Sequence, residues 1–245
     1  MLHAISSNKA GRSLAAAEVH WRQLFKASED SLTSSVFGTL FHLPQELFWK
    51  ILNDACLNGT ITHTAPNIES VQYWPRWDAD GTDKTSHVEP DIFIRTSELD
   101  LIVECKRYDR NQQDPNQWRN QYLAYLNEHK EAERTVILLA VGGLKEDGQE
   151  KVDLGKDLIM KVKKVNWTSI LSQVNLVHDR LYMTKGYLHS IDSVLNILEE
   201  IMLAFEIHGY NTGKWLVDEN FKPFRSIGSD PSKLYPLSFT ENVLQ

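Results

Sequence analysis

The stretch EPDIFIRTSELDLIVECKRYDRNQQDPNQWRNQYLAY, residues 89–125, decides the fold. Its first half holds two runs of apolar β-forming residues with a polar break at residues 96–98 between them, which predicts a hairpin of two strands. Its second half begins a helix at Asp114 and Pro115, because Asp is a favoured N-cap residue and Pro suits the first helical position. The stretch is therefore expected to form a strand, a strand and a helix in direct succession.

The second strand of this hairpin ends in residues of opposite charge. Alternate residues of a strand share a face, so Glu104 and Lys106 point the same way and Cys105 points to the other face. Asp91 follows Pro90 at a position where the partner strand would bring it beside Glu104. Two carboxylates that converge form a hard oxygen site for a divalent ion, and a neighbouring Lys could help a metal-bound water attack a phosphodiester.

The residues Pro90-Asp91 and Glu104-Cys105-Lys106 resemble the motif of the PD-(D/E)xK nuclease superfamily, which has the fold of type II restriction endonucleases. The core motif covers about a seventh of the chain. It implies an α/β fold, restriction-endonuclease-like, with a mixed central sheet flanked by helices. It also implies Mg²⁺-dependent hydrolysis of phosphodiester bonds in DNA.

The resemblance assigns roles to individual residues. Asp91, Glu104 and the backbone carbonyl of Cys105 would hold one or two Mg²⁺ ions, for which Mn²⁺ is expected to substitute. The metal would lower the pKa of a bound water and stabilise the extra negative charge of the transition state. Lys106 would position that water or the scissile phosphate.

The helix that follows the motif carries a polar stripe. Gln117, Gln121 and Tyr125 fall at i, i+4 and i+8, which places them on one side of the helix. Gln121 and Tyr125 also resemble the QxxxY element of RecB-like and related nucleases, which implies that they orient the Lys or a phosphate. The alternative is a partly exposed polar stripe with no catalytic part.

An acidic pair near the N-terminus has two interpretations. Ser28 can cap a helix whose first turn carries Glu29 and Asp30, and acids are favourable at that end of a helix. Members of the superfamily bring a further carboxylate to the metal from their first core helix, and this segment is similar to that element. Glu29 is the preferred metal ligand under the second interpretation, with Asp30 as its substitute.

The composition bounds the class of protein. The 245 residues are 42% hydrophobic and 24% charged, which is ordinary for a globular protein with one large α/β domain. No apolar run approaches the ~20 residues that a membrane span needs, and the N-terminus lacks the apolar region of a signal peptide, so we expect a cytoplasmic protein. The two cysteines, Cys56 and Cys105, are far apart, and no zinc-binding or Walker motif occurs.

The formal net charge of −7 disfavours tight nucleic-acid binding unless cations gather locally. Two clusters are candidates for phosphate contacts. The first contains Lys106, Arg107, Arg110 and Arg119. The second contains Lys161, Lys163 and Lys164, and is either a phosphate-facing edge or a solvated face.

The remaining elements follow from hydrophobic periodicity. Residues 71–77 are expected to form a strand that Pro75 interrupts, which places it at an edge or a bend of the sheet. Residues 134–143 are expected to form a buried central strand, and residues 158–167 a half-exposed edge strand. The segment 144–157 is polar and predicts a loop. Helices are expected at residues 13–27, 44–57, 167–181 and 188–210.

The sequence thus predicts a nuclease-like core at residues 13–175, with residues 176–245 as a helical and extended C-terminal region packed on that core. We expect a metal-dependent endonuclease of bacterial phage defence or of a mobile element, which acts on DNA and takes its targeting from a partner protein. A homodimer is an open alternative, and no membrane contact is expected. The alternative function is a non-cleaving subunit of nuclease fold that binds or assembles a nucleic-acid-processing complex.

Overall fold

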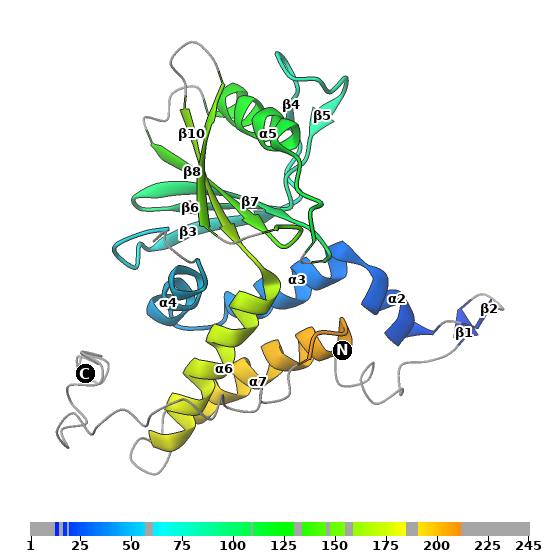
Figure 1. The fold of residues 1–245 in the computed structure, drawn as a ribbon, viewed down its shortest axis with the longest axis vertical. Helices are drawn as coiled ribbons and strands as arrows, with labels where there is room; N and C mark the ends of the chain where they lie inside the picture. Colours follow the sequence, from blue (N-terminus) through cyan, green and yellow to red (C-terminus); the bar gives the residue numbers. More distant parts are fainter. Residues whose placement is uncertain are drawn as a thin grey trace, which may run out of the picture. The chain divides into compact units, whose positions relative to one another are not determined.

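In the computed structural model the chain is described at residues 13–14, 17–18, 20–56, 61–108, 110–129, 134–145, 148–154, 159–184 and 191–211. These residues belong to one compact unit, Met1–Thr212 (Figure 1). The expectations for the tail beyond residue 211 fall outside the described residues. None of the helices in the described ranges is long and apolar enough to cross a lipid bilayer.

A mixed sheet of six strands forms the centre of this unit. Its strand order is β3-β6-β7-β8-β10-β9, in which β7, β8 and β10 run parallel and the other neighbours are antiparallel. The helix α5 provides the crossover that the parallel neighbours β7 and β8 require. The strands are β3 (Ile68–Tyr73), β6 (Ile92–Thr96), β7 (Leu99–Cys105), β8 (Thr135–Val141), β9 (Gly148–Asp153) and β10 (Ile159–Val165).

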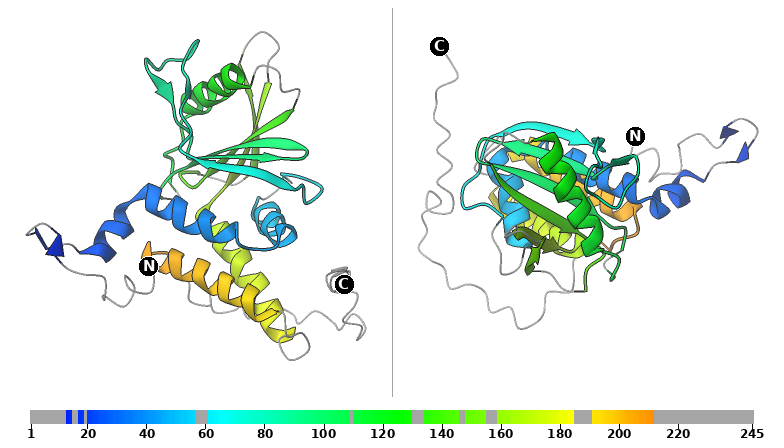
Figure 2. Two further views of the ribbon diagram at one scale, coloured as in Figure 1. Left: turned by 180° about the vertical axis from the view of Figure 1, so that it is seen from behind. Right: turned by 90° about the horizontal axis from the view of Figure 1, so that it is seen from above.

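Helices cover both faces of the sheet. One face shares a hydrophobic core with α3, α4, α6 and α7, and the opposite face shares a second core with α5 and the small β4-β5 sheet. Figures 1 and 2 show α5 on the side of the sheet away from α3 and α4. The bounds are α2 (Trp21–Ala27), α3 (Glu29–Leu40), α4 (Gln45–Ala55), α5 (Pro115–Glu128), α6 (Trp167–Thr184), α7 (Asp192–Ile207), β4 (Trp77–Asp78) and β5 (His87–Val88). The predicted α/β class with a mixed central sheet flanked by helices is therefore confirmed.

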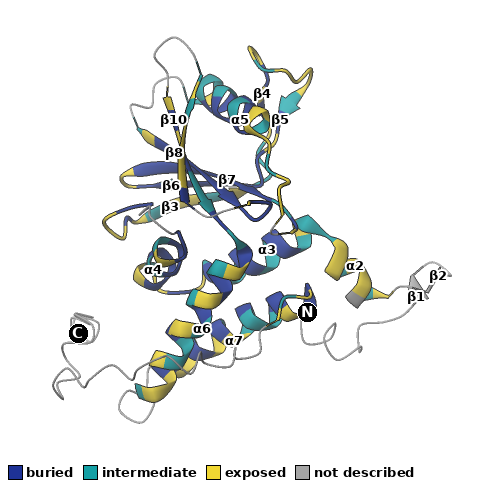
Figure 3. Cartoon of the chain, viewed as in Figure 1, coloured by how far each residue is buried: buried dark blue, intermediate teal, exposed yellow. Residues whose placement is uncertain are grey.

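The strand β7 is buried along its whole length, as Figure 3 shows in dark blue. Val103 and Cys105 belong to the core on the α3 side, whereas Ile102 belongs to the core on the α5 side. Asp100 and Glu104 share the parity of Ile102 and therefore face α5. A strand covered on both faces thus carries two buried carboxylates, and each of them needs polar partners.

Several predicted elements match the structure. The hairpin turns at residues 97–98, where the Thr96 hydroxyl accepts hydrogen bonds from the N–H groups of Glu98 and Leu99 at 3.2 Å and 2.9 Å. β3 lies at an edge of the sheet and β8 lies inside it. Asp114 caps α5 through the N–H of Asn116 at 2.9 Å, with Pro115 in the first turn.

Other predictions are wrong. Part of the segment predicted as a polar loop, residues 144–157, is the strand β9, which occupies the edge of the sheet that β10 was expected to occupy. The backbone ladder of this pairing does not depend on apolar side chains, so the polar composition of β9 did not indicate it. The helix expected from residue 13 begins at Trp21, and upstream residues pair as β1 (Ser13–Leu14) and β2 (Ala17–Glu18). The division of the chain at residue 175 stays a prediction, and that residue lies within α6.

Candidate active site

The ends of β6 and β7 bring Asp91 beside the predicted ExK residues. The Oδ2 of Asp91 accepts a hydrogen bond of 2.7 Å from the backbone N–H of Cys105. Ile92 pairs with Val103 in the antiparallel ladder, so Asp91, just before β6, reaches the last residues of β7. The position that the hairpin predicted for Asp91 is therefore the observed one.

Glu104 is the most heavily bonded carboxylate of the cluster. Its Oε1 accepts hydrogen bonds from Lys106 Nζ at 2.5 Å and from Gln117 Nε2 at 2.7 Å. Its Oε2 accepts a third from Gln121 Nε2 at 2.5 Å. The residue is only 2% exposed, so these bonds replace almost all of its hydration. Lys106 and the first two positions of the predicted glutamine stripe thus converge on Glu104.

Glu29 joins the cluster from the first turn of α3. Its Oε2 accepts a hydrogen bond of 2.7 Å from the backbone N–H of Arg107, and its Oε1 lies 3.6 Å from Lys106 Nζ. Ser28 caps the same helix through the N–H of Ser31 at 3.1 Å, so the capping role and the position at the cluster coexist. Asp30, the alternative ligand, is exposed.

A turn of two glycines shapes the backbone around Lys106. Gly142 and Gly143 follow β8 with φ angles of +66° and +65°. A Cβ at Gly142 would lie 2.4 Å from the Lys106 carbonyl oxygen, and a Cβ at Gly143 would lie 2.6 Å from Lys106 Cβ. The Lys106 carbonyl also accepts a hydrogen bond of 2.7 Å from Trp167 Nε1. Only glycine fits both positions, so this turn fixes where Lys106 stands.

Burial and mutual repulsion perturb the titration of the cluster. Burial, followed by repulsion from Glu104, raises the pKa of Asp91 to about 8. Burial also raises the pKa of Glu104, although attraction to Lys106 opposes that rise. Burial lowers the pKa of Lys106, but attraction to Glu104 outweighs it and the net shift is upward. The field at this end of β7 is therefore strongly negative.

The second buried carboxylate of β7 shows what a charge-balanced site looks like in this fold. Asp100 accepts hydrogen bonds from Arg95 at 3.1 Å and 2.8 Å, and Arg134 Nη1 lies 3.9 Å from its Oδ1. Two guanidinium groups thus balance the charge of one carboxylate. Around Lys106, by contrast, one ammonium lies 2.5 Å from Glu104 and 3.6 Å from Glu29, and Asp91 forms no ion pair within the described residues.

The cluster also contains an unsatisfied polar atom. Gln121 is fully buried, and its Oε1 has no hydrogen-bond partner within the described residues. No three His, Cys, Asp or Glu side chains in the described ranges form a ready-made metal cage, and the Lys106 ammonium lies close to both Glu104 and Glu29. An excess of carboxylate oxygen with a spare amide oxygen beside it nevertheless suits a hard divalent cation.

Tyr125 is the predicted site residue that the structure does not bring to the cluster. Its hydroxyl donates a hydrogen bond of 2.8 Å to Asp100 Oδ2, at the other end of β7 from Glu104. α5 runs antiparallel to β7, so successive members of the helix stripe meet successive acids of the strand. The role implied for Tyr125, orienting Lys106 or a phosphate, does not fit this position.

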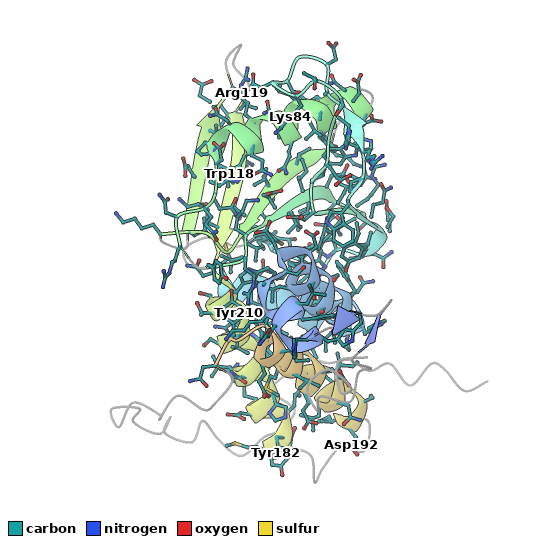
Figure 4. All side chains as sticks on the ribbon, turned by 90° about the vertical axis from the view of Figure 1, so that its right-hand side faces the viewer. Lys84, Trp118, Arg119, Tyr182, Asp192 and Tyr210 are labelled. Carbon is teal, nitrogen blue, oxygen red and sulfur yellow. The ribbon has the colours of Figure 1, made fainter. Side chains whose placement is uncertain are left out.

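The first predicted phosphate patch is not a single surface. Arg107 is 5% exposed, and its guanidinium donates to the carbonyls of Lys26, at the end of α2, and His208, at the end of α7. Tyr210, which is labelled in Figure 4, donates from its hydroxyl to the Arg107 carbonyl at 2.8 Å. Arg119 lies two positions from Gln117 and Gln121, on a different side of α5. Arg107 is thus a structural clamp, because its Nε and Nη2 donate to backbone carbonyls of two helix ends.

Sequence reasoning assigned no role to three supports of the site. Gln117 was placed on the polar stripe and given no function there, yet its amide binds Glu104. Gln113 Nε2 donates to the carbonyls of Glu104 and Gly142 at 3.2 Å and 3.0 Å. The two-glycine sequence after a buried strand was the signal for the third support, the turn at Lys106.

Comparisons with known proteins add little to this geometry. No family model matches the chain, and no curated protein matches it. One solved structure with a partial likeness is the refined half-complex from a tetradecameric assembly of Thermococcus gammatolerans McrB AAA+ hexamers with bound McrC. The TM-score is 0.27 and the identity 11%, over 41% of this chain and 24% of that chain. A likeness of this size carries no argument about fold or function.

Proposed function

We propose that this chain is a metal-dependent endonuclease of the PD-(D/E)xK type, with the restriction-endonuclease-like fold, that hydrolyses phosphodiester bonds of DNA. One observation carries the proposal: Asp91, Glu104 and Glu29 converge at the end of β7, where Lys106 Nζ lies 2.5 Å from Glu104 and 3.6 Å from Glu29. Asp91 and Glu104 are buried, and buried carboxylates without enough cationic partners cost stability, whereas Asp100 of the same strand has Arg95 and Arg134 as partners. A bound divalent cation would remove that cost.

The residues present fit Mg²⁺, with Mn²⁺ as a substitute. Asp91 and Glu104 would hold the ion, with Glu29 and the carbonyl of Cys105 as further oxygen ligands. A bound ion would supply Lewis acidity and offset the charge that develops on a phosphodiester during hydrolysis. The unpaired Oε1 of Gln121 is suited to accept a hydrogen bond from a nearby water.

Lys106 would contact the scissile phosphate or orient the attacking water. Its side chain is 17% exposed and Glu29 is 34% exposed, so the cluster is open to solvent on the side where these two residues lie. The upward pKa shift keeps the Lys106 ammonium charged at neutral pH. A charged ammonium is suited to bind a phosphate oxygen rather than to remove a proton.

The test is cleavage of supercoiled plasmid DNA with Mg²⁺ or Mn²⁺. We expect Asp91→Ala and Lys106→Ala to lower the cleavage rate at least about a hundredfold, because each removes a group at the reacting phosphate. Asp30→Ala is the matched control, since Asp30 is an exposed acid one residue from Glu29. Circular dichroism checks that each variant is folded, and full activity in either cluster variant rejects the assignment.

One observation favours the alternative function, a non-cleaving binding or assembly subunit. Both oxygens of Glu104 already accept hydrogen bonds from protein groups, so a closed network of this kind could be purely structural. Calorimetric titration with Mg²⁺ discriminates between the two functions. Binding that Asp91→Asn abolishes supports the nuclease, whereas no binding and no cleavage support the assembly subunit.

The DNA partner and the biological setting belong to the same proposal. With a net charge of −7 and Arg107 committed to the fold, few cations remain near Lys106 to hold a DNA backbone. We therefore include in the proposal a partner protein, or a second copy of the chain, that supplies cationic surface and targeting. Phage defence and mobile elements are the settings in which such a guided nuclease would act.

A further inference from the structure

A cavity of about 640 Å³ lies at the opposite end of the strands from the carboxylate cluster. It is lined by the first residues of β7 and β8, by β9 and β10, and by the loop that follows α4. Leu99 and Thr135 begin their strands here, whereas Glu104 and Val141 stand near the other ends. None of the lining residues belongs to the cluster around Lys106, so the cavity is a separate feature of the fold.

The floor of the cavity is apolar and one wall is firmly held. Ile61, Leu99 and Ile137 are buried residues of the floor. The Asn53 side chain fixes the wall, because its Oδ1 accepts from the N–H groups of Ile61 and Thr62 at 2.9 Å and 3.2 Å and its Nδ2 donates to the Thr62 carbonyl at 2.9 Å. A preformed apolar floor is typical of sites for organic ligands.

The rim of the cavity is cationic. Lys161 and Lys163 share one face of β10, and Lys151 lies directly opposite Lys161 on β9. Lys163 Nζ donates to the neutral amide of Gln149 at 2.9 Å. In the described part of the chain, neither Lys151 nor Lys161 has a carboxylate partner. Like charges directly opposite on paired strands are unfavourable, so this rim is better suited to an anion than to solvent alone.

The acids of the same cavity do not neutralise these lysines. Glu150 forms an ion pair with Lys164 at 3.1 Å, on the other face of the sheet. Glu98 accepts a hydrogen bond of 2.7 Å from the Thr64 hydroxyl. Lys164, which the sequence grouped with Lys161 and Lys163, is thus separate from the rim.

We propose that this cavity binds a nucleotide, with its phosphates on Lys151, Lys161 and Lys163 and its base on the apolar floor. The volume lies within the roughly 300–1,000 Å³ range of small-molecule sites. Ammonium groups bind phosphate oxygens as point charges. The nucleotide comes either from a free pool or from a nucleic-acid strand, because both present the same chemistry.

The experiment is calorimetric titration of the full chain in EDTA at low salt, with ATP, AMP, inorganic phosphate and a ten-residue oligothymidylate as separate ligands. We expect ATP to bind more tightly than AMP, and both to bind more tightly than inorganic phosphate. Lys151→Gln/Lys161→Gln should weaken ATP binding about tenfold or more, since it removes two charged donors. Lys84→Gln/Lys145→Gln is the charge-matched control and should leave the affinity within about twofold; Figure 4 labels Lys84.

Each outcome decides the proposal or the source of the nucleotide. Oligothymidylate binding that is lost in Lys151→Gln/Lys161→Gln identifies a strand, and ATP binding without oligothymidylate binding identifies a free nucleotide. Equal affinity for ATP and inorganic phosphate, no binding, or binding that is unchanged in a folded Lys151→Gln/Lys161→Gln protein overturns the proposal. Because Asp91→Asn should keep full ATP affinity, failure of this site and failure of the nuclease proposal are distinguishable.

Discussion

Lys106 Nζ lies 2.5 Å from Oε1 of Glu104, a contact between a side chain that is 17% exposed and one that is 3% exposed. Removal of one partner from a buried ion pair leaves an uncompensated charge, at a cost of about 3–5 kcal/mol. We expect Lys106→Met to lower the free energy of unfolding by an amount near the lower end of that range, because Gln117 and Gln121 still bind Glu104. Urea denaturation in EDTA measures it.

The double variant Lys106→Met/Glu104→Gln is the control for that interpretation. This double variant removes both the Glu104 carboxylate and its ion-pair partner, so the free energy of unfolding should recover to within about 1–2 kcal/mol of the wild-type value. A double variant that is less stable than Lys106→Met by the full cost of Glu104→Gln alone would show that the two side chains are not coupled.

Gly143→Ala should damage the site through the position of Lys106. Its φ is +65°, and the added Cβ would lie 2.6 Å from Lys106 Cβ. Gly81→Ala is the matched control, because its φ is +70° with nothing within 4 Å of the new Cβ. Both variants carry the backbone strain of about 1–2 kcal/mol, but Gly143→Ala should cost about 1–3 kcal/mol more and lower plasmid cleavage at least tenfold. Equal effects in the two variants would contradict the close approach to Lys106.

Local patterns were sufficient to predict the meeting of Asp91, Glu104 and Lys106. The apolar β-formers define the hairpin, and strand parity then fixes which side chains share a face. The position of Glu29 could not be obtained in this way, because its contact with the N–H of Arg107 joins residues 78 positions apart. Such a contact depends on how α3 packs against the sheet. The only indication of that packing in the sequence was the resemblance to the nuclease superfamily.

Tyr125 was assigned wrongly to the site although its place in the stripe was right. The eight helical residues from Gln117 to Tyr125 rise about 12 Å, and four strand residues from Glu104 to Asp100 span about 13 Å. An antiparallel helix therefore sets Gln117 on Glu104 and Tyr125 on Asp100, as observed. Comparison of the two rises could have predicted this pairing, since both acids were visible in the sequence.

Substitution of Gln121 should lower the cleavage rate, whereas substitution of Tyr125 should not. Gln121→Leu removes a donor to Glu104 and the unpaired Oε1, so we expect the cleavage rate to fall about tenfold or more. Tyr125→Phe removes only the hydrogen bond to Asp100 and should cost about 1–3 kcal/mol of stability with the cleavage rate kept. Tyr122→Phe is the control, because the Tyr122 hydroxyl has no hydrogen bond within the described residues. A catalytic loss in Tyr125→Phe as large as in Gln121→Leu would restore Tyr125 to the site.

Arg107→Met should destabilise the fold and spare the chemistry. The variant loses the guanidinium donors to the carbonyls of Lys26 and His208, and an unsatisfied buried acceptor such as the His208 carbonyl costs about 1–3 kcal/mol. Glu29 keeps its backbone partner, because the N–H of residue 107 is unchanged. We expect a lower unfolding midpoint in urea with cleavage retained at temperatures where the protein is folded.

Arg119→Met is the control for the clamp. Arg119 makes no hydrogen bond within the described residues, so its loss should change stability by less than about 0.5 kcal/mol. Equal losses of stability in Arg107→Met and Arg119→Met would show that the clamp does not hold α2 and α7.

The titration of Asp91 should make the metal-free protein less stable as the pH rises. Burial and repulsion raise the pKa of Asp91 from 3.8 to about 8 in the folded state, so between these values the folded protein binds more protons than the unfolded chain. The contribution of Asp91 to the free energy of unfolding is therefore fully present below about pH 4. It is lost as the pH rises to about 8, by roughly 2–5 kcal/mol.

The variant Asp91→Asn tests this pH dependence because its side chain cannot ionise. Urea unfolding in EDTA should show a flatter pH profile for the variant, and the variant should be more stable than the wild type at pH 8. Added Mg²⁺ should then stabilise the wild type most at pH 8, where Asp91 is most readily ionised, because the ion binds only the carboxylate form. A profile of the wild type that matches Asp91→Asn from pH 4 to pH 8 would show that Asp91 ionises freely in the folded protein and that the cluster lacks the negative field on which cation binding depends.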